Sequence, residues 1–97
     1  MLLAILAVVF GPWMSLDATS YCQGSTTASG EHVYVGEVAM NTLPLGTRIV
    51  VSPAVFGRSR FRVEDRIGWG SQIDFYNPSC AAAVQFGRRT IRVRVVK

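Results

Sequence analysis

Two aspartates, Asp65 and Asp74, are the residues of this sequence whose types and spacing best suit acid–base chemistry. They lie in the stretch 63–76 (VEDRIGWGSQIDFY), where each belongs to a strand-like apolar run and a glycine-rich bend separates them. Such a bend folds the second run back toward the first, so we expect both carboxylates at one rim of the fold. The alternative is structural, because Asp often hydrogen-bonds the backbone at turns and strand ends.

Short strands are the elements that must position these residues. Turn signals separate the runs, and 59–64 alternates polar with apolar residues, which predicts that Arg60, Arg62 and Glu64 face outward. Asn77-Pro78-Ser79, then 80–86, then Gly87 carry the start and stop signals of one short helix. The expected strands are 18–22, 33–40 with a bend at Gly36, 47–52, 59–64, 72–76 and 90–96, with a polar loop at 23–32 and turns at 41–46 and 53–57.

Six short strands and one helix predict a mainly β fold, a small closed six-stranded β-barrel. Closure removes the exposed edges that such short strands would otherwise present. The chain has 97 residues, which is enough for one small domain. Arginines on the last expected strand then face water and protect its edge.

Residues 1–16 are predicted to be a signal peptide or an N-terminal anchor, which leaves 17–97 as the domain. The first ten residues are apolar and uncharged, and Gly11-Pro12 ends the run. Ten residues are too short to cross a bilayer comfortably, which favours the apolar region of a secretory signal. The basic start of such a signal is missing, because the first basic residue is Arg48. An uncleaved membrane anchor and a buried N-terminal helix of a cytoplasmic protein stay open as alternatives.

The two cysteines and the charge bear on location and partners. Cys22 and Cys80 have no metal-type spacing, so no metal and no cofactor are expected. In an exported domain they would form a disulfide closing a loop of about 57 residues, whereas two buried free thiols are the alternative. The net charge of +4 suits acidic cell-wall polymers in a secreted or cell-envelope protein. Nucleic acid is not the expected partner, and a monomer is expected.

Five short motifs follow one another along residues 18–97: Thr27-Ala28-Ser29-Gly30, Leu43-Pro44-Leu45-Gly46-Thr47-Arg48, Val63-Glu64-Asp65-Arg66-Ile67-Gly68, Ile73-Asp74 and Phe86-Gly87-Arg88-Arg89. This order resembles the 3D-domain family, which includes the barrel of MltA-type lytic transglycosylases. It is also similar to the rare lipoprotein A family and, more loosely, to expansins. The resemblance implies a double-psi β-barrel that cleaves or binds peptidoglycan or a related cell-wall polysaccharide.

The resemblance also implies roles for particular residues. Asp74 would be the general acid and base of a lytic transglycosylase, with Asp65 as its electrostatic neighbour, and Ile73, Phe75 and Asp65 would raise its pKa. Arg66 would pair with Asp65 or contact a substrate carboxylate. Trp69 would stack on a sugar or, alternatively, plug the barrel end. Tyr21 and Thr27 would line the same rim.

The chain departs from the family pattern at two positions. The family's first aspartate falls on Ala39, and the histidine of rare lipoprotein A proteins falls on Met40. The only histidine, His32, belongs to the polar loop and is expected to be solvated. A non-catalytic, expansin-like module that binds or loosens the wall is therefore the alternative function.

Overall fold

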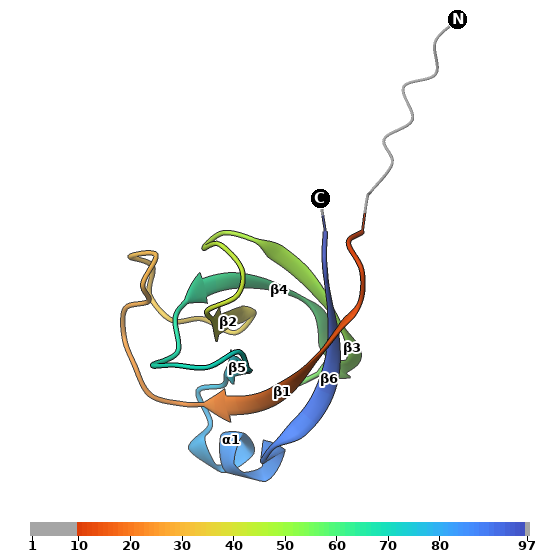
Figure 1. Cartoon of the computed structure of the whole chain (residues 1–97). Helices are drawn as coiled ribbons and strands as arrows, with labels where there is room; N and C mark the ends of the chain where they lie inside the picture. The colour runs from red at the N-terminus through yellow and green to blue at the C-terminus, as the bar shows by residue number, and fades with distance from the viewer. Residues whose placement is uncertain (1–9, 97) are drawn as a thin grey trace, which may run out of the picture.

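The computed structural model describes residues 10–96, which form six strands and one helix (Figure 1). The predicted strand at 18–22 begins earlier, at Met14, so β1 includes residues 14–16 of the predicted N-terminal segment. Residues 1–9 of that predicted segment lie outside the described residues. The elements are β1 (Met14–Tyr21), β2 (Glu37–Met40), β3 (Arg48–Val55), β4 (Arg58–Asp65), β5 (Ile73–Tyr76), α1 (Cys80–Phe86) and β6 (Arg89–Val95).

The strands close into a six-stranded barrel in the order β1-β5-β2-β4-β3-β6, which confirms the predicted mainly β barrel. Two neighbouring pairs, β1 with β5 and β2 with β4, run parallel, and the other four pairs are antiparallel. Chain neighbours such as β1 and β2 are therefore separated in the barrel by a strand from later in the sequence. This interleaving brings residues 19, 39, 65 and 74 from four strands to one side of the barrel.

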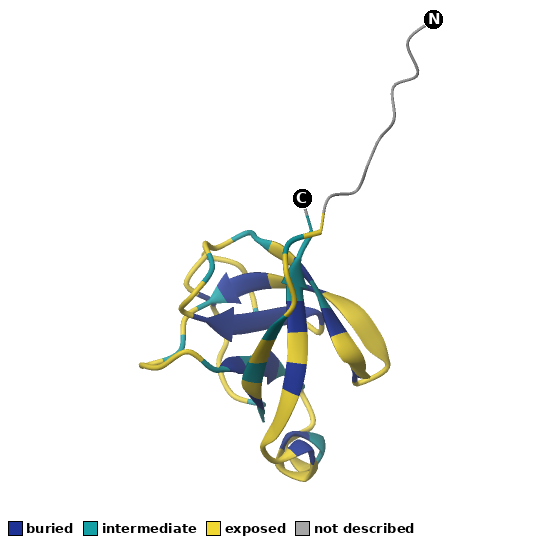
Figure 2. Ribbon diagram, turned by 45° about the vertical axis from the view of Figure 1, so that its right-hand side comes forward, coloured by how far each residue is buried: buried dark blue, intermediate teal, exposed yellow. Residues whose placement is uncertain are grey.

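Alternating side chains fill the barrel, and Figure 2 shows buried and exposed positions following one another along the strands. Inward residues on every strand are almost fully buried, and Phe61 and Phe75 meet edge to face with ring centres 4.8 Å apart. The buried core consists of Ala18, Val38, Met40, Ile49, Val51, Val55, Phe61, Val63, Ile73, Phe75, Phe86, Ile91 and Val93.

Two further predicted boundaries differ from the structure by three residues or more. The strand expected at 33–40 is regular only from Glu37, because Gly36 has a positive φ of 114° and bends the chain before it. The turn expected at 53–57 is shorter, since β3 continues to Val55. The β3–β4 register shifts between Val50 and Val55, an irregularity that accommodates Pro53 within the strand.

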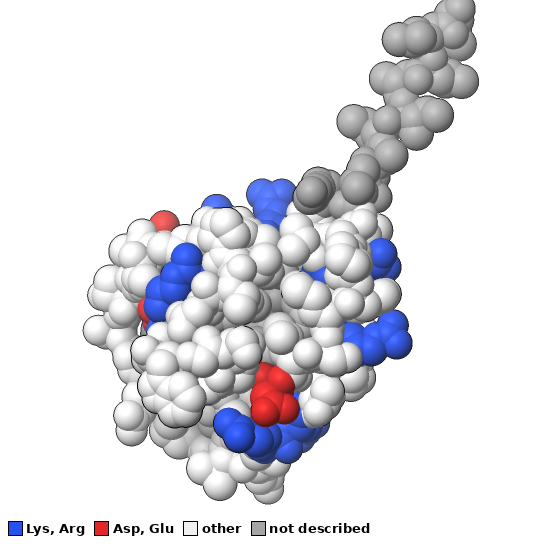
Figure 3. Space-filling model, in the orientation of Figure 1, with Lys and Arg blue, Asp and Glu red and all other residues white. Residues whose placement is uncertain are grey.

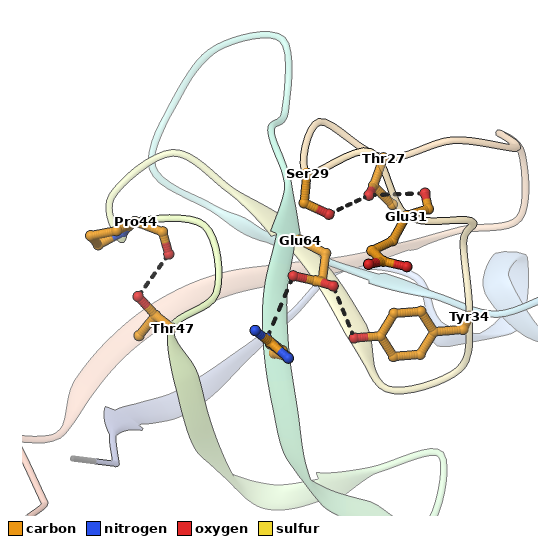
Figure 4. Close-up of polar contacts among 8 residues, drawn as sticks. Thr27, Ser29, Glu31, Tyr34, Pro44, Thr47 and Glu64 are labelled. Atoms are coloured by element: carbon orange, nitrogen blue, oxygen red, sulfur yellow. Dashed lines mark hydrogen bonds and ion pairs between the residues drawn. The ribbon is translucent and has the colours of Figure 1, made fainter.

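Glu64 was predicted to face solvent, and the structure shows that it is buried, with 5% of its surface exposed. Its side chain is covered by the loop between β1 and β2 (Figure 4). From this loop the Tyr34 hydroxyl donates to Glu64 Oε2 at 3.3 Å, and the Ser29 amide donates to the Glu64 carbonyl at 3.0 Å. On the other side, Arg62 Nε lies 3.6 Å from Glu64 Oε1.

The helix and the disulfide confirm two predictions. Ser79 caps α1 by accepting a hydrogen bond from the Ala82 amide at 3.1 Å, and Gly87 ends the helix with a positive φ of 63°. Cys22 and Cys80 are bonded and tie the chain after β1 to the start of α1, which lies below the barrel in Figure 1. The disulfide indicates an oxidising, extracytoplasmic environment.

The one helix found within residues 10–96 is too short and not apolar enough to cross a membrane.

Candidate functional site: a cleft with two carboxylates

The candidate site is a row of four residues on four adjacent strands. Asp65 at the end of β4 is in register with Ala39 on β2, Ala39 with Asp74 on β5, and Asp74 with Thr19 on β1. Adjacent strands lie about 4.8 Å apart, so the two aspartate backbones are separated by roughly 10 Å, with the small side chain of Ala39 between them. The fold thus brings both predicted carboxylates to one side of the barrel.

An open cleft of about 520 Å³ lies over this row. Five of the predicted site residues line it, namely Tyr21, Asp65, Arg66, Trp69 and Asp74. The other lining residues are Thr19, Gln23, Ala39, Ile67, Gly68 and Gln72. The cleft therefore combines acidic, amide, aromatic and basic side chains, which suits a polar ligand such as a sugar chain.

Asp74 is half-buried, and that burial raises the pKa of its carboxyl above the usual value. The Thr19 hydroxyl donates to Asp74 Oδ1 at 3.1 Å and opposes part of this rise, because it favours the charged form. The predicted direction is therefore correct. Its cause is burial rather than the charge of Asp65, and the predicted neighbours Ile73 and Phe75 point into the barrel core, on the other face of β5.

Asp65 has a different environment from Asp74. Its Oδ1 accepts hydrogen bonds from two backbone amides, those of Ala28 at 3.0 Å and Arg66 at 2.8 Å. Asp65 therefore has the structural role given above as the alternative, because it hydrogen-bonds backbone amides at a strand end. It ties the β1–β2 loop to the end of β4. For the Asp74 side chain, the hydrogen bond from Thr19 is the one hydrogen bond found among the described residues.

Arg66 was predicted to pair with Asp65 or with a substrate. Its guanidinium makes no ion pair with Asp65 within residues 10–96, because Nη1 donates to the carbonyls of Met40 and Leu43, each at 2.7 Å. Arg66 thereby holds the turn after β2 against the cleft. Its exposed side chain still lines the cleft, so the predicted ligand contact stays a prediction.

The bend between the two aspartates is held by a residue that the sequence did not single out. Asn41 Oδ1 accepts from the Ile67 amide, and Asn41 Nδ2 donates to the Gly70 carbonyl, both at 3.2 Å. Gly70 in this bend has a positive φ of 97°, a backbone conformation that residues with a side chain rarely adopt. Trp69 projects from this bend with 81% of its surface exposed, so it does not plug the barrel end.

Sequence reasoning also did not identify a buried acid beneath the cleft, Glu37. Glu37 is fully buried, and its Oε1 accepts a hydrogen bond from the hydroxyl of Tyr21. Its Oε2 has no hydrogen-bond partner among the described residues. Burial raises the pKa of Glu37 to about 7, and the charges of Asp65, Glu64 and Asp74 add to the rise.

The signal for Glu37 was present in the sequence as one charged residue inside an otherwise apolar strand. The same burial and the contact with Glu37 raise the pKa of Tyr21. Tyr21 therefore stays protonated and can act as a hydrogen-bond donor.

Thr27, which was predicted to line the rim, does not line the cleft and is buried. Its hydroxyl lies 2.8 Å from the Ser29 hydroxyl and donates to the Glu31 carbonyl at 3.1 Å, contacts that shape the β1–β2 loop (Figure 4). His32 is exposed in the same loop, as expected. No cluster of three metal-ligating side chains occurs within residues 10–96.

The fold and the cleft together define a small, disulfide-bonded mixed β-barrel with one acidic groove across four strands. In comparisons with known proteins, no family model matches the sequence, and no curated protein matches it.

Proposed function

We propose that this protein is a peptidoglycan lytic transglycosylase of the cell envelope or a secreted one, with a double-psi β-barrel of the 3D-domain type. The observation that carries the proposal is the raised pKa of Asp74 in an open polar cleft beside a second aspartate. The five ordered motifs and the mixed barrel with two parallel strand pairs support the same family.

In the proposed reaction Asp74 acts twice. As an acid it gives its proton to the glycosidic oxygen between N-acetylmuramic acid and N-acetylglucosamine, and the bond from C1 to that oxygen breaks. As a carboxylate it then takes the proton of the C6 hydroxyl of the same N-acetylmuramic acid. The C6 oxygen bonds to C1 of that sugar and closes a 1,6-anhydro ring. No water is consumed, so one well-placed acid suffices, whereas hydrolysis usually needs two acids at a defined spacing.

Other residues of the cleft would bind and position the glycan. Trp69 stacks on a sugar face, and the Tyr21 hydroxyl, whose proton is donated to Glu37, accepts a hydrogen bond from a sugar hydroxyl. Arg66 contacts a carboxylate of the substrate, and Asp65 holds the β1–β2 loop through the Ala28 amide while keeping a negative charge near the developing positive charge at C1.

A second candidate function is a non-catalytic module that binds or loosens the wall. Ala39 favours it, because this residue lies directly between Asp65 and Asp74 where the family resemblance expects a third carboxylate. In that function the same cleft binds glycan, and Trp69 remains essential while Asp74 does not.

The test is mass analysis of muropeptides released from purified peptidoglycan by the wild type, Asp74→Asn and Asp17→Asn. Asp17 is a matched control, since it is an exposed acid on β1 that does not line the cleft. We expect 1,6-anhydro products from the wild type and Asp17→Asn only. Binding to the wall with no new products from any of the three would establish the non-catalytic function instead, and reducing-end products would indicate hydrolysis.

A further inference from the structure

A second surface of the barrel carries four arginines at regular positions. Arg58, Arg60 and Arg62 occupy every other position of β4, and Arg48 on β3 is the direct cross-strand neighbour of Arg62. Their inward neighbours Phe61 and Val63 are buried, whereas all four arginines are exposed. We call this set, Arg48, Arg58, Arg60 and Arg62, the arginine face.

The arginine face lines a groove of about 270 Å³ that is separate from the carboxylate cleft. The groove is also lined by Tyr34, Val35, Gly36, Phe61 and Val96, so no acidic side chain contributes to it. In Figure 3 basic side chains lie along the edge on which β3 and β6 are seen in Figure 1. The two surfaces therefore differ in charge, because two aspartates and one arginine line the cleft whereas four arginines line the groove.

Two of the four arginines, Arg58 and Arg62, make a side-chain hydrogen bond or ion pair within the protein. Arg62 pairs with Glu64 at 3.6 Å, and Arg58 donates to the Val35 carbonyl at 2.8 Å. Within residues 10–96, Arg48 and Arg60 make no side-chain hydrogen bond and no ion pair. Like charges directly opposite one another across two strands are destabilising, and an anion bound between Arg48 and Arg62 would remove this repulsion.

We propose that the arginine face binds a linear phosphodiester polymer, such as a poly(polyol phosphate) of a cell wall. Alternate residues of a strand are roughly 6.6 Å apart, a spacing of the same order as that of successive phosphates in an extended polyol phosphate chain. The guanidinium group presents a planar set of donors that matches two oxygens of a phosphate. The site thus goes beyond the proposed cleavage of glycan and would hold the enzyme at the wall.

Two observations favour this polymer over single-stranded nucleic acid. The Cys22–Cys80 disulfide indicates an extracytoplasmic environment. Nucleic-acid grooves also combine positive charge with aromatic side chains on which bases stack. Here the only surface-exposed aromatic of the groove is Tyr34, which is 39% exposed and whose hydroxyl is bound to Glu64.

The experiment measures binding of fluorescently labelled poly(glycerol phosphate) to the full chain by anisotropy at several salt concentrations. Arg48→Gln and Arg60→Gln are compared with Arg88→Gln, a matched loss of one charge at an exposed residue outside the groove. Losing one charge-assisted hydrogen-bonding group raises Kd about tenfold. We expect that rise for Arg48→Gln and Arg60→Gln, and less than a twofold change for Arg88→Gln. Circular dichroism verifies that each variant folds.

Comparison polymers make the assignment specific. Poly(glutamate) of the same charge and a single-stranded oligonucleotide are titrated in parallel, and each should bind at least tenfold more weakly. Equal weakening by all three substitutions, tighter binding of either comparison polymer, or no binding of poly(glycerol phosphate) would overturn the proposal. Asp74→Asn should bind the polymer like the wild type, so loss of cleavage and loss of this binding are separate results.

Discussion

The Tyr21 hydroxyl donates a hydrogen bond to Glu37, so a side chain that lines the cleft is tied to a fully buried acid beneath it. Glu37 Oε2 is the one buried side-chain polar atom without a hydrogen-bond partner among the described residues. The cross-strand neighbour of Glu37 on β4 is Arg62, but burial and the charges of Asp65, Glu64 and Asp74 still raise the pKa of Glu37. The neutral form of Glu37 is therefore favoured in the folded state.

The raised pKa of Glu37 makes the free energy of unfolding depend on pH. The pKa of Glu37 is about 7 in the folded protein against 4.5 ordinarily, so between these values the native state keeps a proton that the unfolded state releases. Its contribution is complete below about pH 4.5 and is lost as the pH rises to about 7. We expect the wild type to lose on the order of 3 kcal/mol of unfolding free energy over this interval, and Glu37→Gln to lose much less.

Urea unfolding at pH 4.5, 6 and 8 tests this dependence. Asp74 changes stability in the same direction, because its pKa is also raised, so Asp74→Asn is measured to subtract its share. Parallel curves for the wild type and Glu37→Gln would show that folding does not raise the pKa of Glu37.

Removal of the Thr19 hydroxyl should shift the pH profile of cleavage. Thr19 donates to Asp74 Oδ1 and stabilises its charged form, so Thr19→Val raises the pKa of Asp74 further. A general acid must be protonated, and activity falls as the pH rises through its pKa. The alkaline limb of the profile should therefore move to higher pH in Thr19→Val, as release of anhydro-muropeptides at fixed substrate measures. Thr19→Ser keeps the hydroxyl and should keep the wild-type limb, whereas a shift toward lower pH in Thr19→Val would contradict the assignment of Asp74.

Trp69 should contribute to binding of glycan with little effect on stability. The side chain is 81% exposed at the rim of the cleft, so its removal costs the fold almost no buried surface. Loss of stacking on a sugar should raise Kd for soluble glycan strands about tenfold, equivalent to ~1.4 kcal/mol. Val84→Ala, at a residue that is 80% exposed on α1, is the control for loss of an exposed apolar side chain. Calorimetric titration that finds equal Kd values for Trp69→Ala and the wild type would remove Trp69 from the site.

Local patterns in the sequence were sufficient for much of the fold. Alternation and turn residues predicted the barrel, and the cap and terminal glycine predicted α1 at its observed bounds. The bend at 66–72 also predicted that Asp65 and Asp74 share one side of the molecule. These features depend on residues that are close together in the sequence, so the pattern of apolar, polar and turn residues is enough to predict them.

The features that sequence reasoning missed depend on long-range contacts. Alternation correctly put Glu64 on the outer side of β4, but a loop from earlier in the chain covers it, with Tyr34 and Glu64 separated by 30 positions. Glu37 required knowledge that Tyr21 lies beside it, 16 positions away on a strand that is not adjacent in the barrel. No local pattern encodes either pairing.

The disulfide should be needed for much of the stability. Cys22 and Cys80 are 58 positions apart, and closing a loop of that size contributes about 4 kcal/mol in the loop-entropy model. Cys22→Ser with Cys80→Ser should lower the unfolding free energy by roughly 2–5 kcal/mol, measured by urea titration. Dithiothreitol should reproduce the loss in the wild type and change nothing in the double variant. An unchanged midpoint in both cases would mean that packing of α1 alone secures this side of the barrel.

Ala39 should control the space between the two carboxylates. It is in register with both Asp65 and Asp74 and lines the cleft, so its short side chain leaves the floor open. Ala39→Leu adds three carbon atoms between the acids and should exclude a sugar ring from Asp74, which lowers kcat/KM for glycan cleavage at least tenfold. Ala39→Ser, which adds one atom, should retain most activity, and the far-ultraviolet circular dichroism of both variants establishes that the barrel forms. Full activity in a folded Ala39→Leu would show that the glycan does not enter between the aspartates, and the acid would then have to be reached from the Trp69 side of the cleft.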